Sequence, residues 1–275
     1  MEKLCENTAS ENIHIWYPDR STPDEDVDCQ KEIDSFATDD IPLAIKSYEK
    51  GGASLYFGSP VDFREVFCKQ LANQLGMNYT AYFPDFTSMS ETEIFISKKG
   101  GYTDFHIDFQ ENFSIQFRGS KKWKLLKSGL KSPLAGFTPH YKKSGNLEHQ
   151  MKLISLQTPI DYDKNHIEDN CISVQLDEGD ILYHPAGIWH AVECIEDSFT
   201  INLSLKNYTK ADIISSSLKH LMNINPSLRE NLTFESKEDF NNQMQEGIDI
   251  AAELVKTLSP QMISPQNQFI PRYVS

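Results

Sequence analysis

The chain has 275 residues, of which 39% are hydrophobic, so it is long enough to bury a core as one large domain. Its 40 acidic residues outnumber its 26 basic residues, and the formal net charge of -14 repels nucleic-acid backbones and anionic membrane surfaces. We therefore expect no nucleic acid and no membrane as partners. No apolar stretch reaches the roughly 18 residues of a spanning helix, and the first residues lack a hydrophobic targeting core, so we expect a cytoplasmic protein.

The first 90 residues are predicted to form an N-terminal extension. Residues 19–40 hold nine acidic residues against two basic ones, and we expect an exposed loop or arm there. This arm is either a solvated segment or a docking surface for a basic substrate. After Pro60, apolar residues recur at helical spacing and predict a helix near 60–76, with these side chains on one face: Phe63, Val66, Phe67, Leu71 and Leu75.

Residues 91–206 change to short runs of Tyr, Phe, Ile and Thr separated by Gly, Pro, Asp and Ser. Many short strands at this spacing indicate a mainly β fold, an antiparallel sandwich or barrel. Residues 127–170 are poorly periodic and are predicted to form a long excursion, of a kind that is often functional. The predicted strands are 92–97, 112–118, 122–126, 181–184, 190–195 and 199–205.

Residues 207–275 return to helical spacing and are predicted to form a C-terminal helical segment. Apolar stripes run through 213–222 and 240–258, and Ser236 and Pro260 are suited to begin and end the second helix. The stripes can pack on the β core or on a second subunit. The predicted organisation is one domain over residues 1–275, with the β core flanked by the extension and the helices.

A His-x-Asp motif, His106-Ile107-Asp108, stands among the predicted strands. Residues i and i+2 of a strand point to the same face, so a His106 nitrogen and an Asp108 oxygen can converge on one point inside a barrel. The motif alone is weak, because a chain with this many His and Asp residues produces it by chance. In this context it supplies two candidate metal ligands.

A third ligand must come from another strand, and residues 179–193 offer two histidines. His184 stands at a strand end, whereas His190 opens the next apolar run and shares a face with Val192 and Cys194. Two His and one carboxylate leave three positions open on one side of a metal, as in non-haem Fe(II) oxygenases. Zinc with the same ligands and a water is the competing interpretation.

Strand alternation places Lys121 inside the predicted barrel. Lys121 shares a face with Trp123 and Leu125, whereas Lys122 and Lys124 point the other way. A lysine held inward near a metal needs an anion, and 2-oxoglutarate fits, since its keto acid end can chelate Fe(II) while its distal carboxylate pairs with the lysine. The alternative is that Lys121 extends its ammonium group to the surface.

An ordered set of motifs over residues 92–206 resembles the JmjC and cupin-like family of Fe(II)- and 2-oxoglutarate-dependent oxygenases. Within the family, the set is most similar to the hydroxylase branch that includes the asparaginyl hydroxylase of hypoxia-inducible factor. The motifs are Thr103-x-x-His106-x-Asp108, Asn112-Phe113, Gly119-x-Lys121-x-Trp123, Gly179-Asp-x-Leu-Tyr-x-Pro185 and Trp189-His190.

The resemblance implies a double-stranded β-helix core, the jelly-roll or cupin fold, with added N-terminal and C-terminal elements. It implies that His106, Asp108 and His190 bind the catalytic iron, which leaves His184 behind the ligands or in a loop. It matches Lys121 to the lysine that binds the distal carboxylate of 2-oxoglutarate. It assigns polar cosubstrate contacts to three further residues, the last of them across an alignment gap: Thr103, Asn112 and Asn202.

The sequence departs from the family pattern at two positions. His184 stands where an aliphatic residue is usual, and Ile188 replaces a frequent aromatic residue. Neither change removes a ligand. Both leave open a different pocket shape, and His184 could compete for the metal.

The resemblance implies a 2-oxoglutarate-dependent dioxygenase that hydroxylates its substrate with Fe(II), 2-oxoglutarate and O2. The acidic surface favours a basic protein or peptide side chain, and the alternative substrate is a free amino acid or a small natural product. Hydroxylation of an N-methyl group would give demethylation by the same chemistry. A non-oxidative metal-binding cupin and a scaffolding protein without turnover are the rival functions. The C-terminal helices resemble those through which several such hydroxylases form homodimers.

Overall fold

The structure is a computed structural model that describes residues 13–16, 35–59, 66, 69–74, 91–139, 152, 163–206 and 209–260. The chain divides into two compact units. One contains the strands and extends to Lys206, and the other contains the helices of residues 209–260. Within the described residues, the helices are too short or too polar to cross a membrane.

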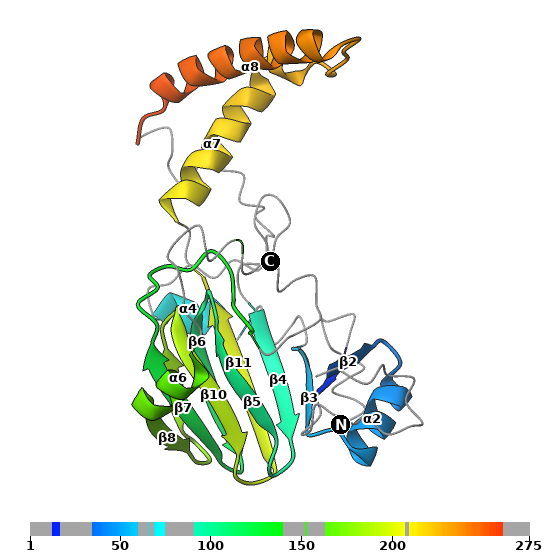
Figure 1. The fold of residues 1–275 in the computed structure, drawn as a ribbon, viewed down its shortest axis with the longest axis vertical. Coiled ribbons are helices and arrows are strands. Elements are labelled where there is room, and N and C mark those ends of the chain that lie inside the picture. The colour runs from blue at the N-terminus through cyan, green and yellow to red at the C-terminus, as the bar shows by residue number, and fades with distance from the viewer. Residues whose placement is uncertain are drawn as a thin grey trace. The chain divides into compact units, whose positions relative to one another are not determined.

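Two antiparallel sheets form the first unit (Figure 1). The major sheet has seven strands in the order β2-β1-β3-β4-β11-β6-β9, and the minor sheet has four in the order β5-β10-β7-β8. The major-sheet strands are β1 (Ile13–Trp16), β2 (Ser35–Thr38), β3 (Ser54–Gly58), β4 (Glu91–Ser97), β6 (Glu111–Arg118), β9 (Ile181–His184) and β11 (Ser198–Leu205). The minor-sheet strands are β5 (Tyr102–Ile107), β7 (Lys121–Lys127), β8 (Ile172–Leu176) and β10 (Ile188–Cys194).

The two faces of the major sheet differ in chemistry, because successive side chains of a strand point to opposite faces. The outer face is apolar and forms the larger core cluster, with these residues at its centre: Ile13, Ile15, Leu55, Phe57, Ile94, Ile115, Ile201 and Leu203. The inner face is mostly polar and comprises the alternate residues of the same strands: His14, Tyr56, Glu93, Phe95, Ser114, Gln116, Thr200 and Asn202. The barrel interior is therefore lined for binding and not filled by apolar packing.

Helix α2 (Ile41–Lys50) packs on the outer face through the buried residues Ala44 and Tyr48. Asp40 begins the helix, since its side chain accepts a hydrogen bond from the Leu43 amide, and Pro42 fits the first turn. Burial of these residues fixes the N-terminal strands against the β core.

A smaller cluster lies on the other side of the minor sheet. Phe105, Ile107 and Trp189 pack there with Phe137 and Ile167, and all five are nearly or completely buried. Ile167 belongs to α6 (Lys164–Asn170), which begins at Asp163. This cluster supports β5 and β10 from behind, so their opposite faces are held rigidly toward the barrel interior.

The six strands predicted from the sequence are confirmed, each within two residues at its ends. Two predictions need correction. The acidic segment 19–40 is not wholly a loop, because Ser35–Thr38 pairs with β1 as an edge strand. The excursion 127–170 contains α6, whose single buried residue, Ile167, is too little to produce a helical pattern.

Part of the helix predicted near 60–76 is present as α4 (Lys69–Gln74), and most of the remainder lies outside the described residues. The free cysteines of the described part are Cys171 and Cys194.

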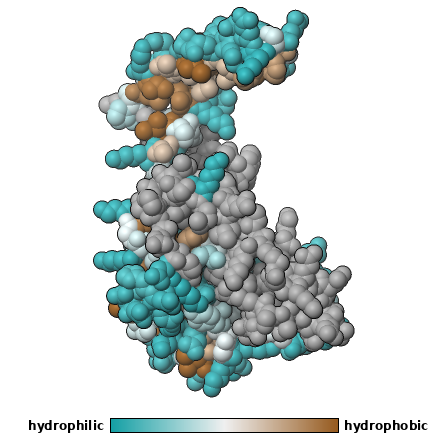
Figure 2. Space-filling model, in the orientation of Figure 1, coloured by the Kyte–Doolittle hydropathy of each residue, from teal (hydrophilic) through white to brown (hydrophobic). Residues whose placement is uncertain are grey.

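The helical unit consists of α7 (Lys210–Ile224), a short 3-10 turn, η2 (Ser227–Arg229), and α8 (Lys237–Thr257). Thr209 and Asp212 form a reciprocal capping box on α7, and Ser236 caps α8 as predicted. No residue of these helices is buried. Figure 2 shows apolar side chains gathered over α7 and along α8. Five apolar residues of these two helices are more than a third exposed: Ile214, Ile224, Met244, Ile248 and Val255.

Candidate metal centre

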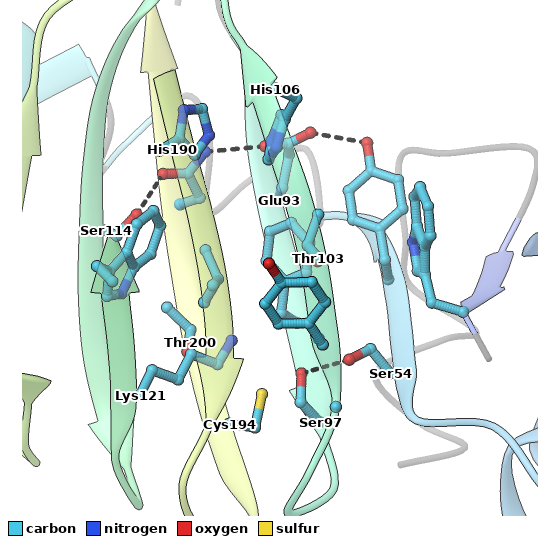
Figure 3. Close-up of a pocket in the computed structure, with 18 of the residues that line it drawn as sticks. Ser54, Glu93, Ser97, Thr103, His106, Ser114, Lys121, His190, Cys194 and Thr200 are labelled. Carbon is cyan, nitrogen blue, oxygen red and sulfur yellow. Dashed lines mark hydrogen bonds between the residues drawn. The ribbon is translucent and has the colours of Figure 1, made fainter. Parts of the chain in front are cut away.

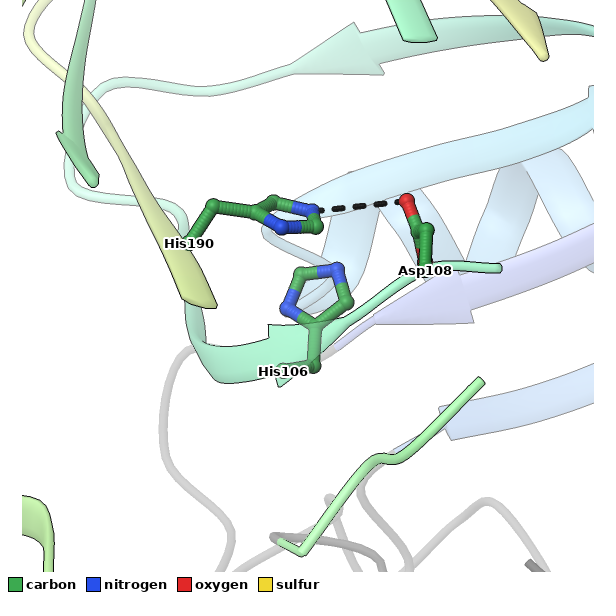
Figure 4. Close-up of side chains that lie close together, drawn as sticks. All are labelled: His106, Asp108 and His190. Atoms are coloured by element: carbon green, nitrogen blue, oxygen red, sulfur yellow. Dashed lines mark ion pairs between the residues drawn. The ribbon is translucent and has the colours of Figure 1, made fainter. Parts of the chain in front are cut away.

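Three predicted ligands meet inside the barrel, at the end of the minor sheet (Figure 4). One ligand atom from each of His106, Asp108 and His190 lies within 4.8 Å of the others. The imidazole centroids of the two histidines are 3.9 Å apart, and His190 Nε2 lies 3.5 Å from Asp108 Oδ2. His106 and His190 come from neighbouring strands, paired across the β5–β10 ladder, which explains their approach.

The backbone orients both imidazole rings. His106 Nδ1 lies 2.8 Å from the Asp104 carbonyl oxygen, and His190 Nδ1 lies 3.1 Å from the Ile188 carbonyl oxygen. A carbonyl oxygen only accepts hydrogen bonds, so each Nδ1 carries the proton and each Nε2 keeps a lone pair for a metal. With the Asp108 carboxylate, this donor set fits a divalent metal held on one side.

Gly187 ties the loop before β10 to Asp108. Its amide donates to the Asp108 carbonyl oxygen at 2.9 Å, and its φ is +81°. A Cβ at this position would stand 2.5 Å from the Leu130 carbonyl oxygen, so only glycine fits. The glycine therefore helps to fix the segment that carries Asp108 beside the strand that carries His190.

A pocket of about 360 Å³ opens beside the three ligands, within the barrel. Figure 3 shows His106 and His190 toward one end of this pocket, and Lys121 and Cys194 toward the other. The inner face of the major sheet supplies one wall, including Glu93 and a strip of three aromatic side chains across β1, β3 and β4: His14, Tyr56 and Phe95. The volume suits a small organic ligand.

Lys121 points into the pocket, as strand alternation predicts. It is 4% exposed, and it faces Cys194 across the β7–β10 ladder. Its Nζ lies 5.3 Å from the centroid of the Phe95 ring, and it makes no hydrogen bond or ion pair with any described residue. Burial lowers the pKa of the Lys121 ammonium group. An unpaired buried cation of this kind favours an anionic ligand.

The predicted polar contacts to a cosubstrate divide into two groups. Thr103 and Asn202 line the pocket. Asn112 is completely buried and lies outside the lining. Its amide nitrogen donates to Asp108 Oδ2 at 3.0 Å and to the Gln110 carbonyl oxygen at 3.1 Å. A contact between Asn112 and a cosubstrate stays a prediction, and the geometry instead joins Asn112 to Asp108.

His184 is neither a loop residue nor one of the three converging ligands. It ends β9, is 3% exposed and pairs with Asn112 across the sheet. Its ring centroid lies 4.4 Å from that of His190, and its Nδ1 has no hydrogen-bond partner among the described residues. Burial lowers the pKa of His184. It therefore contributes an imidazole ring to the pocket wall beside His190.

Glu93 is a pocket residue that no sequence motif indicated. Its side chain lies on the pocket wall, where Oε1 accepts a hydrogen bond from the Tyr56 hydroxyl at 2.7 Å. Burial, reinforced by repulsion from Glu91, raises the pKa of Glu93 to about 7. Alternation in 91–97 could have placed Glu93 beside Phe95 on one face, but it did not indicate which face is internal.

Fold and site together define a double-stranded β-helix protein with a candidate His–Asp–His metal centre, and the predicted fold class is confirmed. The family model of the cupin-like domain matches residues 19–208, and the chain belongs to this family.

Sequence comparison finds YxbC of Bacillus subtilis, an uncharacterized protein, 28% identical over 228 residues that cover 80% of this chain and 66% of YxbC. Ribosomal oxygenase 1 of Danio rerio is 20% identical over 172 residues, which cover 62% of this chain and 26% of that protein. The chain thus spans about two thirds of the first relative and a quarter of the second. A structure of the Escherichia coli ribosomal oxygenase YcfD with cobalt and 2-oxoglutarate matches with a TM-score of 0.46 and 15% identity, over 95% of this chain and 59% of that one.

Proposed function

We propose that the protein is an Fe(II)- and 2-oxoglutarate-dependent dioxygenase that hydroxylates a protein or peptide side chain. The observation that carries this proposal is Lys121, a buried ammonium group without an ionic partner in the described part of the chain, in the same pocket as the His–Asp–His cluster. A zinc or manganese cupin without a cosubstrate has no need for this charge. The pairing of a facial ligand set with an internal cation is what a chelating dicarboxylate requires.

Each residue has a separate task in this proposal. His106, Asp108 and His190 would hold Fe(II), and the ammonium group of Lys121 would pair with the distal carboxylate of 2-oxoglutarate. Thr103 offers a hydroxyl group along the pocket. Asn202 also lines the pocket, but both of its amide hydrogens are donated to Glu93 and Asn112, so its contact with the cosubstrate stays a prediction. When bound, Fe(II) with 2-oxoglutarate and O2 supplies the oxidation that inserts one oxygen atom into a substrate C–H bond, with succinate and CO2 as co-products.

The substrate class is supported by charge and by family membership. The net charge of -14 favours a basic protein or peptide, and one relative is named as a ribosomal oxygenase. We place this activity in the cytoplasm. A free amino acid or small natural product is the alternative substrate, and an N-methyl substrate would be demethylated by the same hydroxylation.

Titration of the metal-free protein under anaerobic conditions tests the proposal without knowledge of the substrate. Fe(II) and then 2-oxoglutarate are added while the visible metal-to-ligand charge-transfer band is recorded. We expect the band in the wild type and its loss in His106→Ala. Metal binding without the band would reject the 2-oxoglutarate chemistry in favour of a non-oxidative cupin.

Lys121→Met separates the two binding tasks. We expect it to bind Fe(II) normally but to need roughly 100-fold more 2-oxoglutarate, since deleting one partner of a buried charge pair costs about 2–5 kcal/mol. Lys122→Met is the matched control, because Lys122 is the next residue on β7 and points to the other face. Equal 2-oxoglutarate affinity in both variants would contradict the role of Lys121.

We also propose that α7 and α8 form a homodimer contact. The exposed apolar residues of both helices, together with the absence of buried residues in them, support this. Sedimentation equilibrium should give twice the chain mass of 31.4 kDa, and Ile248→Glu should shift the protein to monomer. A monomeric wild type at micromolar concentration would reject the contact.

A further inference from the structure

Glu93 stands at one end of a chain of hydrogen bonds whose other end is Asp108. On β4, Glu93 lies directly opposite Asn202 of β11. The two carboxylate oxygens have different partners, because Oε1 accepts from the Tyr56 hydroxyl at 2.7 Å and Oε2 accepts from Asn202 Nδ2 at 3.0 Å. Because Oε2 is the acceptor in this bond, Asn202 turns its amino group toward Glu93.

The orientation of Asn202 sets that of Asn112. Asn202 Nδ2 also lies 2.9 Å from Asn112 Oδ1, and the Ser204 hydroxyl donates to the same Oδ1 at 2.7 Å. On its other side, Asn202 Oδ1 accepts from the Ser114 hydroxyl at 2.8 Å. Asn112 is thus fixed with its carbonyl oxygen toward Asn202 and its amino group toward Asp108.

Asn112 in turn holds the Asp108 carboxylate. Its Nδ2 donates at 3.0 Å to Asp108 Oδ2, the same oxygen that lies 3.5 Å from His190 Nε2. Asp108 follows the last residue of β5, and its side chain is 32% exposed, so packing alone does not fix its rotamer. A reversed Asn112 amide would place its oxygen against the carboxylate and repel it. All hydrogen-bonding positions of Asn112 are filled, with two donated and two accepted bonds.

We propose that Glu93 is a positioning residue for Asp108, which it orients through the Asn202 and Asn112 amides. This inference rests on the proposed function, because it assumes that Asp108 binds a metal. Groups that hydrogen-bond to metal ligands fix their orientation, and their mutation typically weakens metal affinity by about 10- to 100-fold. Glu93 lies one step further out, so we expect an effect near the lower limit.

Co(II) titration of the metal-free full-length protein tests the inference, with the Co(II) absorption bands as the readout. Glu93→Met keeps the length of the side chain but removes both acceptors, and we expect about 10-fold weaker Co(II) binding and altered bands. Glu93→Gln keeps one acceptor for Asn202 and should restore affinity to within about 3-fold of the wild type. The melting temperature of each metal-free variant checks that it folds.

A double-mutant cycle separates transmission through Asn112 from general destabilisation. Asn112→Ala interrupts the chain next to Asp108, so adding Glu93→Met to it should weaken Co(II) binding no further. Tyr183→Phe is the matched control, because it removes a hydrogen bond of the same kind, from Tyr183 to Glu111 at 2.6 Å, outside the pocket lining, and should leave Co(II) affinity unchanged.

The outcomes distinguish this inference from the proposed function. Unchanged Co(II) affinity in Glu93→Met, or additive losses in the double mutant, would overturn the positioning role while the metal site stands. Normal Co(II) affinity in Glu93→Gln with loss only in Glu93→Met supports it. A wild type that binds no Co(II) would reject the metal site itself and the role of Glu93 with it.

Discussion

The two faces of the major sheet are built by the same strands but serve opposite purposes. On the outer face, Leu55 and Phe57 are completely buried against apolar neighbours and under α2. On the inner face, their neighbour Tyr56 meets His14 and Phe95 and donates to Glu93. The outer face therefore stabilises the domain by apolar burial, whereas the inner face buries polar side chains that line the pocket.

Buried polar atoms without a hydrogen-bond partner indicate where a ligand binds inside the barrel better than the general polarity of the interior does. Most inner-face side chains satisfy one another, as Gln116 and Thr200 do through a hydrogen bond of 3.0 Å. Lys121 and His184 keep polar atoms without a hydrogen bond to any described residue, although both are at least 96% buried. Such groups normally find a partner, so their position marks where a ligand is expected.

The largest loss of activity should come from a substitution in the candidate metal centre. His106→Ala should abolish 2-oxoglutarate turnover, measured as succinate formation, because two ligands do not hold the metal. The metal-free protein should lose only about 1 kcal/mol of unfolding free energy, the usual worth of one hydrogen bond. Full turnover in this variant would refute the site.

A substitution on the outer face should instead lower stability and leave metal affinity unchanged. Phe57→Ala removes a completely buried ring and should lower the free energy of unfolding by about 3–5 kcal/mol, measured by urea denaturation. At temperatures where the variant remains folded, its Co(II) affinity should match that of the wild type. A loss of affinity without a loss of stability would contradict the division between the faces.

Lys121→Met should stabilise the metal-free protein, although it weakens 2-oxoglutarate binding. Replacing an unpaired buried charge by an apolar side chain of similar length removes a desolvation penalty, and we expect a gain of about 1–3 kcal/mol. Urea denaturation of both proteins without ligands measures it. A less stable variant would show that Lys121 has a structural partner.

The last prediction concerns pH. Burial raises the pKa of Glu93 from 4.5 to about 7, so the folded protein binds more protons than the unfolded chain between these values. Stability contributed by this group is therefore present below pH 4.5 and is lost as the pH rises toward 7. Relative to Glu93→Gln, which does not titrate, the metal-free wild type should become less stable across this window. If the free energies of unfolding of the two proteins changed with pH in parallel, the raised pKa of Glu93 would be contradicted.

The sequence predicted the elements whose patterns are local. Alternation in the β7 region predicted that Lys121 faces inward, and the two-residue spacing predicted that His106 and Asp108 converge. The family motifs were needed to choose His190 over His184, because both histidines end up beside each other inside the barrel. Local pattern alone does not say which of them meets β5.

Features that depend on distant partners escaped prediction. The strand Ser35–Thr38 lies in an acidic segment, and only its pairing with β1 identifies it. The role of Glu93 depends on Asn202, which is 109 residues away in the chain. Alternating polar and apolar residues predict two faces, but here the polar face is internal, against the usual expectation for a sheet.

The pairing of β5 with β10 also bears on how the protein folds. His106 and His190 are 84 residues apart in the sequence, and their strands meet only when most of the barrel is in place. Closing such long loops is slow, and the ligands come together late. We therefore expect a bound metal to slow the unfolding of the barrel while leaving its folding rate nearly unchanged. The metal would stabilise the folded barrel without taking part in the folding nucleus.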